Sequence, residues 1–314
     1  MHSEPYNHPS AESYPQDVQY YLATEIRHKA IWGPYVHPPL PGFHTSPFLS
    51  RPKPNSAHRR MIVDLSWPKG ASVNYATSSH IHMNSACALT YPTIDQMVHE
   101  AVGKNGSDSC HLFKVDLERA FQNLRIDPND YSLMGLYWDG AYYQDVGLAF
   151  GVKLGSFFCQ SVTDAIRHIM AQHGFTVYNY SDDILGIHSS KAISEQAFIF
   201  LLALLDDLGL PTSSKKVEAP SRVLTCLGIE FDMDNQEIRI PHVKLNEILE
   251  LCNQWASRTS ATKNQIQSSL GKLVHIGKCV RPARVFINRM LQVLRQAPDS
   301  GHVRLSRDFQ KDIN

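Results

Sequence analysis

The sequence contains no stretch that is apolar enough to cross a membrane. Its longest apolar run, residues 197–205, has nine residues and is followed by two aspartates, whereas a spanning helix needs about 20 apolar residues. The first five residues also lack the basic and then apolar order of a secretory signal. We therefore expect an intracellular protein that has no membrane partner.

The cysteine and histidine patterns of common metal and redox sites are missing as well. The six cysteines are widely scattered, and no pair has the spacing of zinc ligands or of a redox motif. The sixteen histidines include no His-Glu-x-x-His sequence, and His80 and His82 are interpreted as surface residues. These absences argue against a zinc enzyme and indicate a reducing compartment.

An overall excess of positive charge, which is common in proteins that bind nucleic acids, is absent because 30 basic and 30 acidic residues balance. The charge is nevertheless unevenly distributed. Residues 263–314 contain ten Lys and Arg against three Asp, a net charge of +7, so the rest of the chain carries −7. This pattern favours a phosphate-binding C-terminal part beside an acidic site, and a merely solvated helix face is the alternative.

What the sequence does contain is two acidic stretches at the ends of predicted strands. Residues 176–187 alternate β-branched and aromatic residues up to Asp182 and Asp183 and continue as an apolar run, which predicts a hairpin with both aspartates at its tip. Residues 111–115 predict a buried strand that ends at Asp116. Each aspartate has a structural alternative, a turn residue or a helix N-cap. Together, three carboxylates at two strand ends suit two Mg²⁺ ions, which prefer hard oxygen ligands.

Both stretches resemble motifs of a known enzyme family. Residues 113–121, Phe-Lys-Val-Asp-Leu-Glu-Arg-Ala-Phe, resemble motif A of reverse transcriptases, and residues 180–183, Tyr-Ser-Asp-Asp, resemble their motif C. The flanking sequence is closer still to reverse transcriptases of DIRS-type retrotransposons, which mobilise with a tyrosine recombinase. That similarity extends over roughly residues 20–300 and includes Gly33-Pro34, Ser46-Pro47-Phe48 and residues 70–74, 227–232 and 269–273.

The resemblance implies an α+β right-hand polymerase fold with fingers, an antiparallel palm sheet and a helical thumb. We expect a disordered, Pro-rich tail at residues 1–17, fingers and palm at 18–241, a thumb at 242–298, and at 299–314 the start of a connection toward an RNase H domain missing from this chain. Periodicity predicts helices over residues 18–31, 94–102, 157–172, 191–208, 242–257, 262–275 and 282–296. Further hairpins are predicted for residues 48–65, 131–146 and 223–240, the last with one strand from 223 to 232.

The resemblance also implies which residues form the active site. Asp116, Asp182 and Asp183 match the catalytic carboxylates, which hold two Mg²⁺ ions (or Mn²⁺), and the carbonyl oxygen of Leu117 matches a further metal ligand. Such ions, about 4 Å apart, activate an attacking hydroxyl and stabilise the leaving pyrophosphate.

Further residues match positions around the nucleotide. Phe121 matches the steric gate that excludes a 2′-hydroxyl, and ordinary core packing is its alternative. Gly151 and Gln160 match motif B, where a glycine lets the backbone approach the base and the template. The chain departs from the family pattern at Gly155-Ser156, where Ala-Pro is common, and at Ala149, where a proline is usual.

Basic residues are expected to bind phosphates in three places. In the first hairpin, Lys53 and Arg60 match positions that contact the triphosphate, with Arg59 as the alternative to Arg60. Lys216 resembles the motif D lysine, a general acid toward pyrophosphate, and its alternatives are the adjacent Lys215 or a plain surface pair. The thumb residues expected to follow duplex phosphates are Lys272, Lys278, Arg281, Arg284 and Arg289.

The expected function is template-directed DNA synthesis from deoxynucleoside triphosphates (dNTPs) on an RNA or DNA template with a primer, as part of a retrotransposon. RNase H and tyrosine recombinase domains encoded by the same element are expected partners. One alternative is an RNA-dependent RNA polymerase of the same shape, against which Phe121 and Tyr180 argue. Another is an inactive or domesticated relic that binds RNA.

Overall fold

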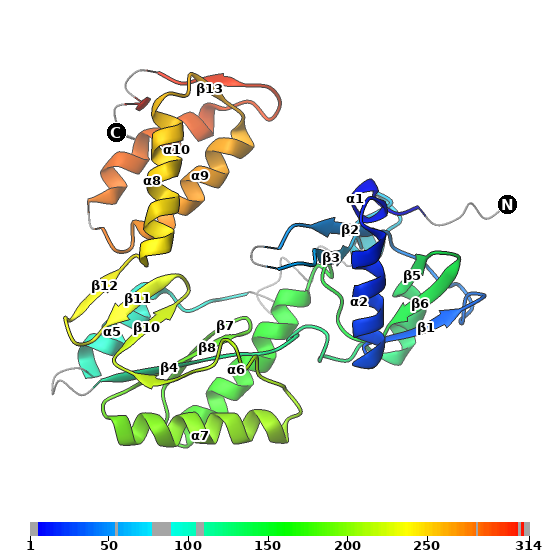
Figure 1. Ribbon diagram of the computed structural model, residues 1–314, viewed down its shortest axis with the longest axis horizontal. Coiled ribbons are helices and arrows are strands. Elements are labelled where there is room, and N and C mark those ends of the chain that lie inside the picture. Colours follow the sequence, from blue (N-terminus) through cyan, green and yellow to red (C-terminus); the bar gives the residue numbers. More distant parts are fainter. Residues whose placement is uncertain are drawn as a thin grey trace.

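The computed structural model describes residues 6–53, 56–76, 89–104, 110–280, 282–306 and 309–310. Figure 1 shows a palm built on a β-sheet at the bottom of the view, the fingers at the right and a helical thumb at the upper left. The order of these parts and their antiparallel sheets confirm the expected α+β fold. Among the described residues, every helix falls short of the length or apolarity that a membrane crossing requires.

The palm sheet has the strand order β7-β8-β4-β9, and its pairings are antiparallel. Both faces of β4 are buried because its side chains alternate between two cores. Phe113 and Val115 pack with apolar residues of α6 and α7, whereas Leu112 packs with α5 and with the small sheet β10-β11-β12. The bounds are α5 (Ile94–Lys104), β4 (His111–Asp116), α6 (Gly155–Gln172), β7 (Val177–Tyr180), β8 (Asp183–His188), α7 (Lys191–Asp207) and β9 (Glu218–Ser221).

The fingers combine the sheet β1-β6-β5 with the hairpin β2-β3 and two N-terminal helices. The predicted Asp-Gly turn is confirmed: Asp139 and Gly140 both have positive φ, 52° and 77°, as a two-residue type I′ turn requires. The bounds are α1 (Pro9–Glu12), α2 (Pro15–Arg27), β1 (Ile31–Tyr35), β2 (Phe48–Arg51), β3 (Arg60–Val63), α3 (Val73–Ala76), the 3₁₀ helix η2 (Pro128–Leu133), β5 (Gly135–Trp138) and β6 (Ala141–Asp145).

The prediction of a disordered tail at residues 1–17 is wrong for the part that the structure describes. From Asn7 onward the segment docks on the fingers: the Asn7 side chain donates to the Tyr137 carbonyl at 3.0 Å and accepts from the Phe48 amide at 2.9 Å. Ala11 in α1 is fully buried in the fingers core. Composition gave no sign of this because the ordering contacts come from strands far away in the sequence. Residues 1–5 lie outside the described part.

The strand predicted for residues 223–232 is two strands. β10 (Val223–Cys226) and β11 (Ile229–Asp232) form a hairpin around Leu227 and Gly228, whose φ values are 50° and 71°, and β12 (Glu237–Arg239) adds a third strand. Leucine rarely adopts positive φ, so Leu227-Gly228 gives a weaker turn signal than an Asn-Gly or Asp-Gly pair.

The thumb contains α8 (His242–Ala256), α9 (Lys263–Ile276) and α10 (Ala283–Gln296). It also has a short antiparallel strand pair, β13 (Ser260–Ala261) between α8 and α9 and β14 (Val303–Arg304) after α10. The boundary expected between residues 298 and 299 is not where this unit ends. Leu305 and Phe309 are buried in the thumb core beside Trp255 and Ile266. Pro298 follows the end of α10 as a helix stop, but the chain then turns back and completes the same core.

Candidate active site

The three predicted aspartates meet where two central strands of the palm end. Tyr180 pairs with Asp183 across the β7-β8 hairpin, so Ser181 and Asp182 form its two-residue turn, with Ser181 at φ 56°. On the other side of β8, Asp183 stands opposite Asp116 of β4, and antiparallel partners have Cα atoms about 4.5–5.5 Å apart. The Leu117 amide donates to the Asp182 carbonyl at 3.0 Å. The predicted convergence of residues 116, 182 and 183 is thus confirmed.

Gln160 supports this turn from beneath. It is 3% exposed, its Oε1 accepts from the Ser181 amide at 2.9 Å, and its Nε2 donates to the Asn179 carbonyl at 3.3 Å. Asn179 is itself held by Thr163 at 2.9 Å. In this structure the Gln160 side chain is buried, and its polar atoms bond to the turn, to its strand and to Asp164. These contacts favour a positioning role, and the expected contact with a nucleotide stays a prediction.

Burial and mutual repulsion raise the pKa of two carboxyl groups. The pKa of Asp183 rises from 3.8 to about 6, first through burial and then through the charges of Asp182 and Asp116. Burial also raises the pKa of Asp182, Asp116 adds to the effect, and Lys216 and Arg60 oppose it. Carboxylates crowded in this way are stabilised by a nearby cation.

Lys216 places its ammonium group beside Asp116, the most buried of the three aspartates. Its Nζ lies 2.7 Å from Oδ2 of Asp116, whose side chain is 5% exposed. Burial lowers the pKa of Lys216, but the hydrogen bond to Asp116 and the charges of Asp182 and Asp183 outweigh it, so the pKa is raised overall. This contact distinguishes Lys216 from Lys215, the alternative that the sequence left open.

The donor set suits magnesium, although the side chains do not form a ready-made metal cage. Within the described residues, no group of three or more His, Cys, Asp and Glu side chains is arranged to hold a metal ion. The ammonium group of Lys216 instead lies against Asp116, as a stand-in cation. Three hard carboxylate groups at one edge, with positive charge drawn to them, fit a divalent ion chemically.

The fingers hairpin brings one arginine to this edge and turns its neighbour away. Arg60 is close enough to Asp182 to lower its pKa. Arg59 points back toward the N-terminal helices: its Nε donates to Ser50 at 2.8 Å, and its guanidinium lies 4.0 Å from the ring centre of Tyr14. The structure therefore favours Arg60 over Arg59. Lys53 is exposed just beyond β2.

Comparison with known proteins agrees with this geometry. Residues 51–231, more than half of the chain, match the family model described as reverse transcriptase (RNA-dependent DNA polymerase). The chain belongs to the reverse transcriptase family. A search of curated protein sequences gives no match.

Solved structures of foamy viral protease–reverse transcriptase have the same fold. A complex with double-stranded DNA matches with a TM-score of 0.70 at 15% identity, covering 95% of this chain and 46% of that one. A complex with an RNA/DNA hybrid matches with a TM-score of 0.66 at 14% identity, covering 98% and 37%. The chain thus spans less than half the length of these viral proteins.

The reverse transcriptase motif B segment is attached to the fingers. The Phe150 carbonyl accepts from the Val63 amide at 3.3 Å, and Gly151 has φ 124° with its Cα against the Val63 carbonyl, where a β-carbon would collide. The glycine match is therefore explained first by close packing on β3. Phe121, the predicted steric gate, is half-buried, and its ring centre lies 4.8 Å from that of Phe150.

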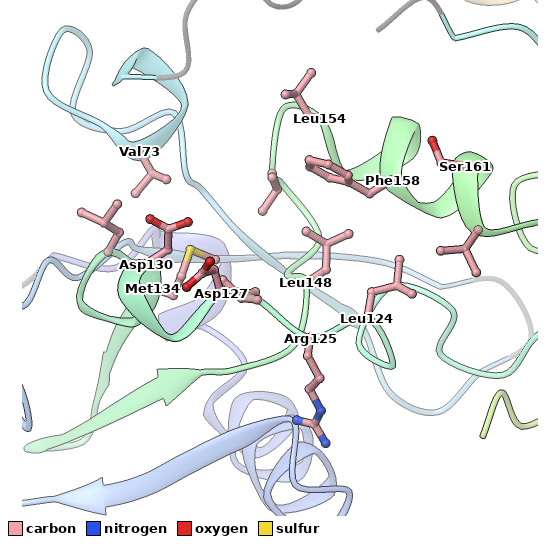
Figure 2. Close-up of a pocket in the computed structure, with 14 residues that line it drawn as sticks. Val73, Leu124, Arg125, Asp127, Asp130, Met134, Leu148, Leu154, Phe158 and Ser161 are labelled. Carbon is pink, nitrogen blue, oxygen red and sulfur yellow. The ribbon is translucent and has the colours of Figure 1, made fainter. Parts of the chain in front are cut away.

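A cavity of about 720 Å³ lies beside this segment, and Figure 2 shows the residues that line it. Leu148, Leu154 and Phe158 line it from motif B and the first turns of α6, and Met134 lines it from the side of η2. The Arg125 side chain extends away from it in the view and donates to the Lys29 carbonyl at 2.6 Å. The first turn of α6 therefore borders open, mostly apolar space.

The predicted phosphate-binding residues of the thumb differ in their surroundings. Lys278 forms an ion pair with Asp95 of α5 at 2.8 Å, which ties the base of the thumb to the palm. Lys272 is exposed on α9, and Arg289 is half-buried on α10. Arg281 lies outside the described residues, as does the side chain of Arg284. Duplex binding by this set remains a prediction.

Two features of the site were missed by sequence reasoning. Tyr91 stacks on Tyr180 with ring centres 4.2 Å apart, next to the aspartate turn. Arg119, three residues after Asp116, forms a buried ion pair with Glu25 of α2. Neither contact has a local signal, because each joins residues far apart in the chain, although Arg119 is part of the motif A sequence.

Proposed function

We propose that this chain synthesises DNA from dNTPs on an RNA template, using two Mg²⁺ ions. The observation that carries the proposal is the strand register that sets Asp116 opposite Asp183, with Asp182 in the adjoining two-residue turn. This arrangement collects three carboxylate groups where two central palm strands end. Membership of the reverse transcriptase family supports the same reaction.

Each residue of the site has a role that follows from its position. Asp116, Asp182 and Asp183 would hold the metal ions, with the Leu117 carbonyl as an additional ligand. Bound Mg²⁺ would lower the pKa of the primer 3′-hydroxyl and neutralise charge on the pyrophosphate. Lys216 would move from Asp116 to the leaving pyrophosphate and donate a proton. Arg60 would bind the triphosphate from the fingers side.

We also propose that the chain acts within a DIRS-type retrotransposon in the cell. The flanking motifs support this assignment, and the partial coverage of the viral proteins is consistent with a longer polyprotein. RNase H and a tyrosine recombinase would then be supplied by the same element. Sequencing the reading frame on both sides of this chain tests the assignment: a recombinase gene supports it, and an integrase gene contradicts it.

The polymerase proposal is tested by primer extension on poly(A) with an oligo(dT) primer. We expect Mg²⁺-dependent extension by the wild type, its loss on chelation with EDTA, and a reduction of about 1000-fold in Asp182→Asn because a metal ligand is removed. Asp207→Asn, which changes an exposed residue of α7, is the matched control and should retain full activity. Equal extension by wild type and Asp182→Asn would refute the assignment.

The same assay separates the two alternatives. Supplying ribonucleotides in place of dNTPs tests the first alternative, because an RNA-dependent RNA polymerase would extend an RNA primer with them efficiently. Measuring template–primer binding by fluorescence anisotropy tests the second alternative. An inactive relic would bind RNA but extend no primer with either Mg²⁺ or Mn²⁺. Discrimination in favour of dNTPs would reflect Phe121 acting as the gate.

A further inference from the structure

Phe121 lies against a residue that has no side chain. A β-carbon built on Gly155 would lie 3.3 Å from Cε1 and 3.5 Å from Cδ1 of the Phe121 ring. Ordinary carbon contacts are about 3.5–4.0 Å, so an alanine methyl group would press on the ring edge and the ring would have to move by a few tenths of an ångström. Gly155 is the first residue of α6 and has no positive φ. The nearest atoms that an added side chain would meet are therefore those of the ring, and the backbone conformation does not require glycine.

The ring has little freedom to retreat on its inner side. Phe121 packs against the palm core, whose neighbouring members Ala120 and Cys159 are buried, and Phe150 flanks it at 4.8 Å between ring centres. Protein cores are close-packed, so a displaced ring moves toward its exposed side. Leu154 and Phe158 on the same turn of α6 border the cavity in Figure 2. The first turn of α6 therefore has room to shift slightly toward the cavity when a methyl group is added to Gly155.

We propose that Gly155 is a specificity-determining residue that sets the depth of the Phe121 ring and thereby the space left for the sugar of the incoming nucleotide. The inference rests on the proposed polymerase function. Gly155 touches no substrate in this scheme and acts only through the ring. Adding a methyl group pushes the ring outward, which narrows the space above it for deoxyribose and more so for ribose.

Single-nucleotide incorporation of dTTP and UTP opposite A measures the effect. For Gly155→Ala we expect kcat/KM to fall about threefold for dTTP, mainly through KM, and about tenfold or more for UTP, so that discrimination rises several-fold. Gly155→Ser should shift it in the same direction. Gly271→Ala in α9, where the added β-carbon meets nothing within 4 Å beyond its own helix backbone and its chain neighbours, is the control and should leave the ratio unchanged.

A double-mutant cycle shows whether the effect passes through the ring. Phe121→Ala should relax discrimination, and adding Gly155→Ala to it should change the UTP/dTTP ratio by less than about twofold, because the two residues couple only through their contact. An unchanged ratio in Gly155→Ala, or the same change with and without the Phe121 ring, would overturn the inference. A wild type that incorporates no nucleotide would instead refute the polymerase function itself.

Discussion

Two groups of carboxylates lie on either side of motif A in this chain, and they differ in how deeply they are buried and in their partners. The palm edge group consists of Asp116, Asp182 and Asp183, with Asp182 and Asp183 half-buried and Lys216 alongside. The junction group, where motif A meets the fingers, consists of Glu25, Asp145 and the paired Arg119. Asp145 is 1% exposed, and neither of its carboxylate oxygens has a hydrogen-bond partner among the described residues.

Burial raises carboxyl pKa values in both groups, so a raised pKa alone does not identify a site. The pKa of Asp145 is raised well above 3.8, first by burial and then by the charge of Glu25, much as burial raises that of Asp183. The difference is that Asp182 and Asp183 are only half-buried, and that the Lys216 side chain beside them is 60% exposed and free to move aside. Access and exchangeable countercharge distinguish a reactive group of acids from a buried one.

Replacing one acid from each group should give the largest contrast. We expect Asp183→Asn to reduce primer extension about 1000-fold, because a metal ligand is lost, and Asp145→Asn to leave it within about twofold. Asp145→Asn should also raise the free energy of unfolding at neutral pH by about 1–3 kcal/mol, because the amide removes a buried acid that has no partner. Primer extension and urea unfolding measure the two effects.

The pH dependence gives an internal control for the junction group. An acid whose folded pKa is raised contributes stability that is complete below its unfolded pKa of 3.8 and is lost as the pH rises through the folded value. Asp145→Asn should therefore stabilise the protein more at neutral pH than near pH 4. An Asp145→Asn protein that is less stable than wild type at neutral pH would show that the carboxylate has a partner.

The palm contains a buried base that titrates in the opposite sense. His188 on β8 is 2% exposed, and its Nε2 accepts from the Thr176 amide at 3.2 Å. Burial, reinforced by Lys104, lowers its pKa from 6.5 to about 4. Between these two pKa values the imidazole is protonated in the unfolded chain and neutral in the folded chain. The free energy of unfolding therefore decreases as the pH falls below 6.5.

We expect the free energy of unfolding to drop by about 2 kcal/mol between pH 7.5 and pH 5 on account of His188. His188→Phe should abolish most of this slope, and His28→Phe, which changes an exposed histidine, should not. Urea unfolding across the pH range measures it. A slope that is the same in wild type and His188→Phe would mean that another group accounts for the acid lability.

Local patterns were enough to predict most helices and hairpins and to place the three acids at strand ends, whereas the overall fold and the roles of the acids were predicted from the family resemblance. The hairpins around Asp139-Gly140 and around residues 181–182 depend on turn chemistry that neighbouring residues encode, and strand ends place the aspartates. The features that the sequence did not predict depend on contacts between residues far apart in the chain. The docking of Asn7 needs strands 41 and 130 residues away. The bond that ties Gln160 to the aspartate turn likewise joins residues 21 apart.

The site's charges could be predicted only in part for the same reason. Family motifs selected Lys216 and Arg60 among adjacent basic residues, but only the fold shows which of each pair faces the aspartates. The two acids of the junction group gave no signal in the sequence, because Glu25 and Asp145 are 120 residues apart and come together only in the folded chain.

The smallest of the expected effects concerns the exchangeable countercharge at the palm edge. Lys216→Met should lower kcat for nucleotide incorporation about tenfold and leave KM nearly unchanged. This loss is below the usual range for a general acid, because the Lys216 side chain is 60% exposed and water can replace its proton. Lys215→Met should change kcat by less than about twofold. Equal losses of kcat in the two variants would mean that Lys216 contributes only positive charge near the site. Its contact with Asp116 would then have no part in catalysis.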